Sequence, residues 1–388
     1  MAVAAIPVSD PTLLAEIRRY GKFDPTGCYQ CGSCTLSCDL VENSVTFPRR
    51  SIRYALLGLK QPLVASLEPW VCHDCGDCSI VCPRQSEPRI SMITLRRFLS
   101  AQYEWTGIGR RLLQSQAWYL GSLISVAVFT VLLIVGYHLW YLAMPAHDFA
   151  TMAVGFEHMF PRMTYYTLAV ILLPLLLLLS RILHIWRLTM GGEGHARIPW
   201  STYAVEAWVY AYESAAQPLM HRCKEHSRWL GHALLAVGTV MMLVIKVLAL
   251  RWFQTDNIYP IYHPQRWLGY LATGFILYGI GDILNCRLRA HKEICKETHF
   301  QDLVFPVLLL STAISGLAAH IFRIFGFGLT CHFAYALHVV IATPMLVIEM
   351  SFGKWAHMVY RPLALYFLAV RERASRQAPA AEVVLHAL

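Results

Sequence analysis

Beyond residue 115, the chain alternates long apolar stretches with short polar segments. Six apolar stretches reach about 20 residues, the length that an α-helix needs to cross the hydrocarbon core of a bilayer. They occupy residues 116–143, 165–187, 229–252, 266–285, 302–324 and 331–353. The pattern predicts six transmembrane helices. The short turn around Gly326 and Gly328 predicts that the last two helices form an antiparallel hairpin.

The first 110 residues lack such long apolar stretches and instead show the spacing of short amphipathic helices. Within residues 48–60, apolar side chains recur at the i, i+3, i+4 and i+7 spacing of an amphipathic helix, at Ile52, Ala55, Leu56 and Leu59. Two further helices are predicted around residues 12–20 and 90–100. We therefore expect a helical head domain over residues 1–110, a membrane domain over residues 111–373 and a disordered tail over residues 374–388.

The composition supports a membrane protein, because 56% of the residues are hydrophobic and only 15% are charged. The net charge of +9 does not indicate a nucleic-acid-binding surface, since most Lys and Arg residues flank apolar stretches. Residues 1–25 lack the positive start and apolar run of a cleavable signal peptide.

Loop charge predicts the orientation. Segments 181–228, 285–302 and 351–388 together hold fifteen Lys and Arg residues, whereas segments 145–164, 251–266 and 323–331 hold four. The positive-inside rule places the first set in the cytoplasm. We therefore expect a multi-pass protein of the cytoplasmic membrane, with the head domain and both termini inside.

The head domain contains two cysteine runs of identical C-x2-C-x2-C-x3-C spacing. Bacterial two-cluster ferredoxins have this pattern, and in them the fourth cysteine of one run binds the cluster of the other run. The motif therefore assigns one 4Fe–4S cluster to Cys28, Cys31, Cys34 and Cys82, and a second to Cys72, Cys75, Cys78 and Cys38. Pro83 completes the second run, whereas Asp39 follows the first.

Zinc and disulfides are alternatives for these cysteines. Zinc sites pair two C-x2-C knuckles more often than they use four-cysteine runs. Disulfides between cysteines so close in tight loops are strained. Cluster thiolates also require a reducing compartment, which agrees with the cytoplasmic placement.

Histidines near the ends of the apolar stretches are candidates for haem b ligands, because an imidazole pair holds iron in a state suited to electron transfer. Ionisable groups inside a membrane are costly and usually functional. We expect His320 with His338 to bind an outer haem, and His232 with His357 to bind an inner haem. His184 is a further candidate, His226 competes with His232 on the third span, and each histidine could instead cap a helix at the interface.

Other polar residues allow further interpretations. Lys246 lies at the depth of the outer haem and could hydrogen-bond a quinone, or it could extend to the outer surface. Glu349 lies near an inner helix end, where interfacial solvation would explain it. A metal site at His291, Cys295 and His299 is a weaker alternative. No glycine-rich dinucleotide fingerprint follows a strand, so flavin or nicotinamide chemistry would belong to partner subunits.

The whole arrangement resembles the membrane-bound C subunit of quinone-interacting membrane-bound oxidoreductase (Qmo) complexes. The cysteine runs resemble the small iron–sulfur subunit of heterodisulfide reductase. His338 and the stretch from Phe352 to Pro362 resemble the cytochrome b family that includes the nitrate reductase gamma subunit. In that family two histidines lie one membrane width apart in the last span, as His338 and His357 do here. A further ligand pair there is spaced by ten residues, and Met242 stands here at the second position of that pair.

The resemblance implies an all-α protein, with a helical two-cluster ferredoxin domain fused to a six-span transmembrane helix bundle. It implies two 4Fe–4S clusters, two b haems and menaquinone as substrate. The implied partners are soluble flavin and iron–sulfur subunits like the A and B subunits of Qmo, and adenylylsulfate reductase. Alternatives are the membrane subunit of another heterodisulfide-reductase-like or sulfite-reductase-linked complex, and a membrane anchor or redox sensor that does not conduct electrons.

Overall fold

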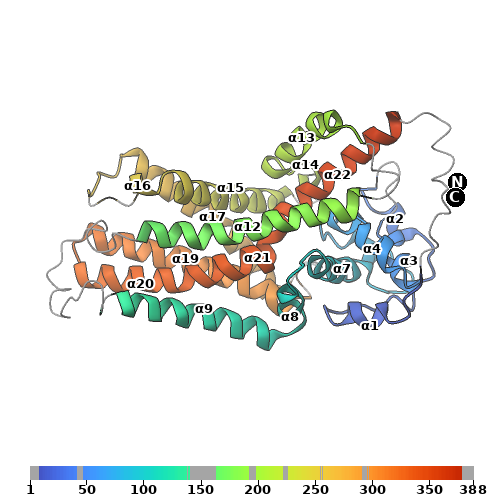
Figure 1. Ribbon diagram of the computed structural model, residues 1–388, viewed down its shortest axis with the longest axis horizontal. Helices are drawn as coiled ribbons and strands as arrows, with labels where there is room; N and C mark the ends of the chain where they lie inside the picture. Colours follow the sequence, from blue (N-terminus) through green and yellow to red (C-terminus); the bar gives the residue numbers. More distant parts are fainter. Residues whose placement is uncertain are drawn as a thin grey trace. The chain divides into compact units, whose positions relative to one another are not determined.

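The computed structural model describes residues 8–41, 47–137, 139, 163–191, 198–221, 226–253, 255, 257–290, 295 and 297–377. Within these residues every regular element is helical (Figure 1). The prediction of an all-α fold is confirmed.

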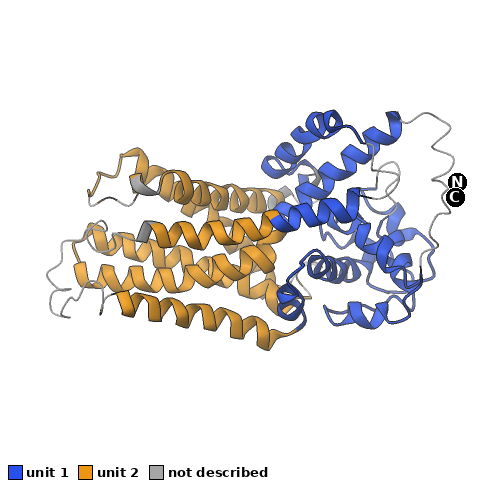
Figure 2. Cartoon of the chain, in the orientation of Figure 1, with its two compact units in different colours: residues 1–114, 180–226, 357–388 blue, residues 115–179, 227–356 orange. Residues whose placement is uncertain are grey.

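The chain forms two compact units (Figure 2). Unit 1 comprises residues 1–114, 180–226 and 357–388, and unit 2 comprises residues 115–179 and 227–356. This division differs from the linear one expected from the sequence, because two later segments pack with the N-terminal domain. The last helix of unit 1 continues to Gln377, so residues 374–377 of the expected tail are helical, and residues 378–388 lie outside the described residues.

Unit 1 begins with eight short helices. These are α1 (Leu13–Arg18), α2 (Ser33–Leu36), α3 (Arg49–Leu56), α4 (Lys60–Ala65), α5 (Glu68–Val71), α6 (Asp77–Ile80), α7 (Pro88–Gln102) and α8 (Ile108–Gln114). The longest of them, α7, begins with a proline at its first position, which suits the preset φ of that residue.

The core of unit 1 forms on one face of α7. Met92, Leu95 and Leu99 are fully buried and follow the i, i+3, i+7 spacing of a helix face. Tyr20, just beyond α1, packs edge-on against Phe98 with ring centroids 5.7 Å apart. The two helices predicted around residues 12–20 and 90–100 therefore form, and they contribute to the same core.

The helix predicted within residues 48–60 is α3. Ile52 and Ala55 are buried as expected, whereas Leu56 and Leu59 are only half-buried. The helix ends at Leu56 because the chain turns at Gly58, whose φ of 69° lies in the left-handed region.

Residues 181–228, which the loop charges predict to be a connecting segment, contain α13 (Trp200–Ala215) and α14 (Pro218–His221). Helix α13 packs along α22 (His357–Gln377). The Tyr366 hydroxyl donates to the Tyr203 carbonyl oxygen at 2.9 Å, and Arg373 pairs with Glu206 at 2.8 Å. These contacts join two segments that are far apart in the sequence into unit 1.

Unit 2 contains the long apolar helices. They are α9 (Gln116–Gly136), the first part of α12 (Met163–Met190), α15 (His226–Leu248), α17 (Pro264–Arg289), α19 (Phe300–Ile324) and α20 (Gly328–Pro344), with the short α16 (Leu250–Phe253) between α15 and α17. In the described part of the chain, six helices are long and apolar enough to cross a membrane, and the sixth runs from Gly328 to Phe352. The number of predicted spans is therefore confirmed. Helices α19 and α20 form the expected hairpin, and α9 packs against α20 (Figure 1).

The sixth span changes its helical form after Pro344. A π-helical segment, η2 (Met345–Glu349), continues into α21 (Met350–Phe352), and a 3₁₀ turn, η3 (Lys354–Ala356), follows. Between them the backbone of Gly353 is extended. His338 and His357 therefore do not lie on one continuous helix, as the sequence analysis assumed, because His357 begins α22.

Glu349 explains part of this break. Its side chain is fully buried, so interfacial solvation is the wrong explanation for it. One carboxylate oxygen accepts the Lys354 backbone N–H at 2.9 Å. The carboxylate also lies so close to Gly353 that a Cβ there would meet Oε2 and the Glu349 backbone. Glycine therefore suits position 353.

Candidate iron–sulfur and membrane sites

The two cysteine runs fold with the same local backbone. Residue 30 and residue 74, each two positions after the first cysteine of a run, have positive φ angles. Gly32 and Gly76 follow with φ angles of 88° and 100°, and each begins a one-turn helix. Glycine suits these positions because residues with a Cβ are strained there. The loops therefore direct several cysteine side chains of each run inward.

Four thiols line one small cavity in unit 1, and four line another. The first cavity contains Cys28, Cys31, Cys34 and Cys82, and the second contains Cys38, Cys72, Cys75 and Cys78. Each set takes three cysteines from one run and the fourth from the other. The structure thus brings together the same sets that the ferredoxin pattern groups.

The first cavity is open to solvent at one thiol. Cys31 is exposed, and its Sγ lies 3.4 Å from the Ser33 hydroxyl. Cys82 Sγ lies 3.3 Å from the Ser86 hydroxyl. Two arginines, Arg49 and Arg84, also line this cavity. Its residues therefore offer positive charge and hydrogen bonds to a negatively charged group.

The thiols of the second cavity are less exposed than those of the first. Cys72 is buried, and burial raises the pKa of the Cys38 thiol to about 12. Burial also raises the pKa of the Cys78 thiol, and the neighbouring thiolates add to this effect. Such thiols do not ionise readily by themselves, whereas bound metal deprotonates a coordinating thiol. The donor set therefore fits a metal cluster better than free thiols.

Charged side chains beside the second cavity are paired within the protein. Arg89 is buried and its Nε lies 2.6 Å from the Asp74 carboxylate. The Asp74 backbone N–H donates to Cys72 Sγ at 3.4 Å. His73, also buried, contacts the guanidinium of Arg361 on α22. The surroundings of this cavity are thus fixed by long-range contacts within unit 1.

An aromatic cluster lies next to that contact. Trp70, two residues before Cys72, packs edge-on against Tyr360 of α22 at 5.4 Å and stacks with Tyr103 at 6.3 Å. The two tyrosine rings are themselves 6.1 Å apart. Helix α22, which begins with His357, is therefore held against the segment that leads into the second cysteine run.

Unit 2 contains a cavity of about 340 Å³ between its long helices. This volume lies within the range of small-molecule and cofactor sites. Most of its lining is apolar, and the polar or sulfur-bearing residues include Lys246, Tyr270, His320, His338, Met242, Met345, Arg266, Arg323 and Tyr335.

Hydrogen bonds orient the two histidines of this cavity differently. His338 Nδ1 lies 3.0 Å from the Thr312 carbonyl oxygen and 3.2 Å from the Ser315 hydroxyl. When Nδ1 carries the proton and donates to the carbonyl, Nε2 has a free lone pair for a metal. His320 Nε2 instead lies 2.8 Å from the Tyr270 hydroxyl. His338 is therefore ready to bind a metal, and His320 would have to release this contact first.

The remaining predicted residues are distributed over both units. His232 lies half-buried on α15 in unit 2 and is not among the residues that line the cavity. His357 and His184 belong to unit 1. Pairing His232 with His357 joins residues of different units and stays a prediction. The sequence analysis missed Tyr270 as a polar lining residue; its spacing gave no signal of a partner.

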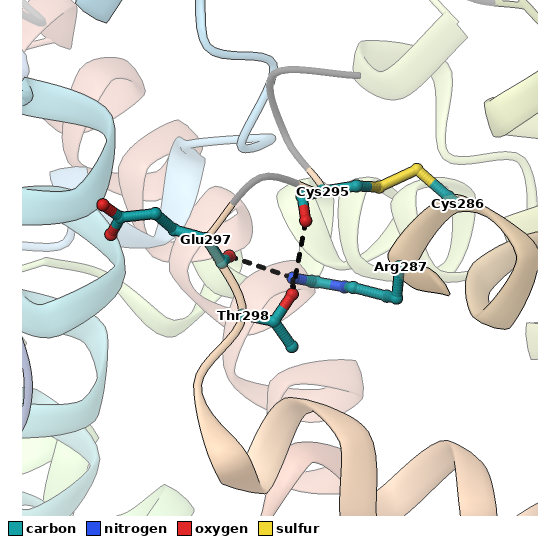
Figure 3. The surroundings of a disulfide bond; sticks show 5 residues. All are labelled: Cys286, Arg287, Cys295, Glu297 and Thr298. Atoms are coloured by element: carbon teal, nitrogen blue, oxygen red, sulfur yellow. Dashed lines mark hydrogen bonds between the residues drawn. A yellow bond between two sulfur atoms is a disulfide. The ribbon is translucent and has the colours of Figure 1, made fainter. Parts of the chain in front are cut away.

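The structure contains a disulfide between Cys286, at the end of α17, and Cys295 (Figure 3). Arg287 beside it donates to the Glu297 carbonyl oxygen at 3.2 Å and to the Thr298 hydroxyl at 2.9 Å. The suggested metal site that included Cys295 is therefore wrong in this structure, because its sulfur is bonded to Cys286. His291 of that site lies outside the described residues.

Comparisons with known proteins identify the head domain. Residues 25–86, which include all eight clustered cysteines, match the 4Fe-4S dicluster domain family. A protein of Archaeoglobus profundus that is like the C subunit of heterodisulfide reductase is 32% identical over 77 residues. That match covers 20% of this chain and 41% of the relative. No solved structure matches the chain. The chain thus carries an iron–sulfur domain related to the C subunit of heterodisulfide reductase, together with six apolar helices of a membrane protein.

Proposed function

We propose that this chain is a membrane subunit that passes electrons between a quinone in the bilayer and soluble redox partners. The observation that carries the proposal is the joining of two four-thiol cavities to a bundle with a histidine-lined cavity. Thiol sets of this kind hold iron–sulfur clusters, which exchange single electrons. Such a chain needs no complete active site for a soluble substrate.

The two cysteine sets would each hold one 4Fe–4S cluster. Cys28, Cys31, Cys34 and Cys82 surround the first, and Cys38, Cys72, Cys75 and Cys78 surround the second. The hydrogen bonds to Sγ of Cys31, Cys72 and Cys82 fit this role, because hydrogen bonds to cluster sulfurs tune the reduction potential.

The cavity of unit 2 contains two candidate haem ligands, and one of them, His338, could bind iron without any rearrangement. His338 would bind iron through Nε2, with the Thr312 carbonyl oxygen fixing its ring. His320 would be the second candidate ligand, and its Nε2 now contacts the Tyr270 hydroxyl. Haem iron, when bound, accepts and releases one electron. Gly316 keeps the space beside His338 free, since a Cβ there would meet its ring at 3.0 Å.

A second haem would use His232 and His357, with His184 as a further candidate. Two features of unit 1 support an electron path that includes His357. Helix α22 begins at this residue and packs against α5, the segment before Cys72. Arg361, one turn later, contacts His73 beside the second cysteine set.

Lys246 is the proposed quinone-binding residue. It lines the same cavity as His320 and His338. A lysine ammonium there would donate a hydrogen bond to a quinone oxygen and hold a proton close to the reduced ring. Replacing Lys246 by Met keeps the length and the apolar stem and removes the charge. We expect this change to weaken reduction by a menaquinol analogue while leaving the clusters intact.

The resemblance to Qmo complexes gives this proposal its context. In that setting the quinone would be menaquinone, and the partners would be soluble flavin and iron–sulfur subunits and adenylylsulfate reductase. The head domain and both termini would face the cytoplasm. A second candidate is a membrane subunit of another heterodisulfide-reductase-like complex, which the relative of the head domain favours. Partner subunits that co-purify with the chain would separate the two.

Pyridine haemochrome analysis and iron quantification of the purified full chain test the proposal. We expect b-type haem together with about eight cluster irons, the content of two 4Fe–4S centres. His338→Ala should remove the haem of the unit 2 cavity. His332→Ala, a buried histidine of the same helix outside the cavity lining, is the matched control and should keep it.

The second haem ligand is tested by two more variants. His320→Ala should leave the haem of the unit 2 cavity bound through His338 and convert it to a high-spin form. Met242→Leu should leave the spectrum unchanged. The opposite result would assign the second ligand to the methionine sulfur, since Met242 lines the same cavity. Zinc in the cysteine sites, or a chain without haem, would refute the proposed function.

A further inference from the structure

One face of unit 1 exposes a cluster-binding thiol. Cys31 is the exposed member of the first cysteine set, and the neighbouring Tyr29 ring is 69% exposed. Leu36, at the end of α2, is 90% exposed, and Ile80, at the end of α6, is 69% exposed. Helices α2 and α6 contact each other. Large apolar side chains with this much exposure around a redox centre are typical of an interaction surface.

Two arginines give this surface a positive charge. Arg49 and Arg84 are exposed and line the first cavity together with Tyr29 and Cys31, and we call these four residues the Cys31 face. The Arg49 guanidinium lies over Gly32, because a Cβ on that glycine would meet its Nη1 at 3.4 Å. Arg84 lies over the Tyr29 ring, 4.6 Å from its centroid. Both cations therefore line the same small cavity as Cys31.

The positive charge of this face is available to a partner. None of the residues that line the first cavity is an aspartate or glutamate. Among the described residues, no ion pair joins Arg49 or Arg84 to a carboxylate. At the second cavity, by contrast, Asp74 pairs with the buried Arg89. Charge of one sign around an opening concentrates partners of the opposite sign and speeds their association.

We propose that the Cys31 face is the docking surface for a soluble electron carrier whose own docking face is acidic. The inference rests on the proposed function and adds the site and the charge of the partner. One electron leaves the reduced cluster beside Cys31, which is oxidised by one electron, and the acceptor is reduced by one. No bond forms or breaks, and no proton moves.

A protein partner fits this face better than a lipid surface. Electron exchange requires that donor and acceptor come close, and the exposed Cys31 would bring the edge of a bound cluster to the surface beside Tyr29, Arg49 and Arg84. A bilayer of anionic lipid would also attract Arg49 and Arg84, but it would cover the thiol without accepting an electron. The lipid alternative is therefore an outcome of the test.

The test measures oxidation of the dithionite-reduced full chain in neutral-lipid nanodiscs by two small complexes of opposite charge. Ferricyanide is a triply charged anion, and hexaamminecobalt(III) is a triply charged cation. We expect the double variant Arg49→Gln/Arg84→Gln to lower the second-order rate constant for ferricyanide by about tenfold at low salt. The rate constant for the cation should rise, and both effects should shrink as salt is added.

The matched control changes two arginines that lie elsewhere on unit 1. Arg19 and Arg53 are exposed and do not line the first cavity. Arg19→Gln/Arg53→Gln alters the net charge of the chain by the same amount. We expect its rate constants to stay within about twofold of the unmodified chain, since steering depends on charge near the opening.

A second readout does not require electron transfer. Hexacyanochromate(III) is a paramagnetic, redox-inert anion, and we expect it to relax the EPR signal of one cluster more strongly than the other. The double variant should lose this relaxation, and the control should keep it. Leu36→Asp should weaken the relaxation by hexacyanochromate(III) by adding a negative charge, while the EPR signals of both clusters remain.

Three results would overturn the inference. Equal rate constants for the double variant and the control would show that the arginines do not steer anions to the cluster. Equal relaxation of both cluster EPR signals by hexacyanochromate(III) would mean that the cluster beside Cys31 is not the more exposed of the two. Loss of the ferricyanide effect in nanodiscs of anionic lipid would assign the face to the bilayer. A chain without EPR-active clusters would refute the proposed function instead, so the two failures are distinguishable.

Discussion

The two cysteine sites share one backbone design but differ in their surroundings. Each uses a left-handed glycine before a one-turn helix, Gly32 in the first site and Gly76 in the second. The first site exposes Cys31 and is bordered by arginines that have solvent access. The second buries Cys72 and is bordered by the Arg89–Asp74 pair. Local sequence therefore builds the ligand loops, and tertiary contacts make the two sites different.

The difference in charge indicates what each site contacts. Charge that faces solvent is suited to a partner that comes and goes, whereas charge neutralised within the protein is suited to a fixed environment. The second site also connects to α22 through His73 and Arg361. We therefore interpret the first site as the one that serves soluble partners and the second as the one linked to the remainder of the chain.

The largest expected effect comes from the two crossing cysteines. We call the first site, with Cys31, the exposed site and the second site, with Cys72, the buried site. Cys82→Ser should remove the cluster of the exposed site, and Cys38→Ser should remove the cluster of the buried site. Each change should remove about four of the eight cluster irons and leave any haem iron in place. Iron quantification with EPR of the remaining cluster measures this. Cys331→Ser, a buried cysteine of α20 outside both sets, is the control and should change neither.

These variants also test whether the fourth cysteine of each run binds the cluster of the other run. If the runs were not crossed, Cys82→Ser would remove the cluster held by Cys72, Cys75 and Cys78. The remaining EPR signal would then belong to the exposed site and would still respond to hexacyanochromate(III). In the crossed arrangement the remaining signal belongs to the buried site and should not respond.

A smaller effect should follow from the buried ion pair of the second site. Arg89→Ala removes the guanidinium that pairs with the Asp74 carboxylate, which is only 15% exposed. Breaking a buried pair in this way costs about 3 kcal/mol of the free energy of unfolding. Loss of cluster absorbance in urea should therefore occur at a lower midpoint.

The exposed arginine of the first site provides the comparison. Arg84→Ala removes only a contact with the exposed Tyr29 ring, so we expect a change within about 0.5 kcal/mol. Equal midpoints for Arg84→Ala and Arg89→Ala would contradict the view that tertiary contacts distinguish the sites. That result would mean that the Arg89–Asp74 pair contributes no more than a surface contact.

The features that the sequence predicted well are those with a short period. The ferredoxin motif, rather than the spacing alone, predicted which four thiols line each cavity. The six apolar stretches predicted six helices, since length and hydropathy alone decide whether a helix suits a bilayer. For the helices the evidence lies within about 20 neighbouring residues.

The features that were missed depend on residues far apart in the chain. Arg361 contacts His73 across a separation of 288 residues, and no local pattern marks such a pair. The break after Glu349 depends on its buried carboxylate and on Gly353, which look like an ordinary helix end in the sequence. Helix α13 was missed because Ser201, Glu206 and Glu213 interrupt its apolar residues, so its sequence contains no long apolar run. Position 357 therefore could not be placed by counting along one helix.

The smallest expected effect concerns the contact between Arg361 and His73. Arg361→Gln removes a positive charge near the second cluster. This loss stabilises the oxidised form of that cluster relative to its reduced form. We expect its reduction potential to fall by on the order of 40 mV, the equivalent of about 1 kcal/mol for a one-electron couple. An EPR redox titration measures both clusters in one sample, and the cluster of the exposed site should keep its potential. Arg376→Gln, on the same helix and 72% exposed, is the control and should shift neither. Equal shifts of both clusters would mean that Arg361 acts on unit 1 as a whole, and the buried site would then lose its separate link to α22.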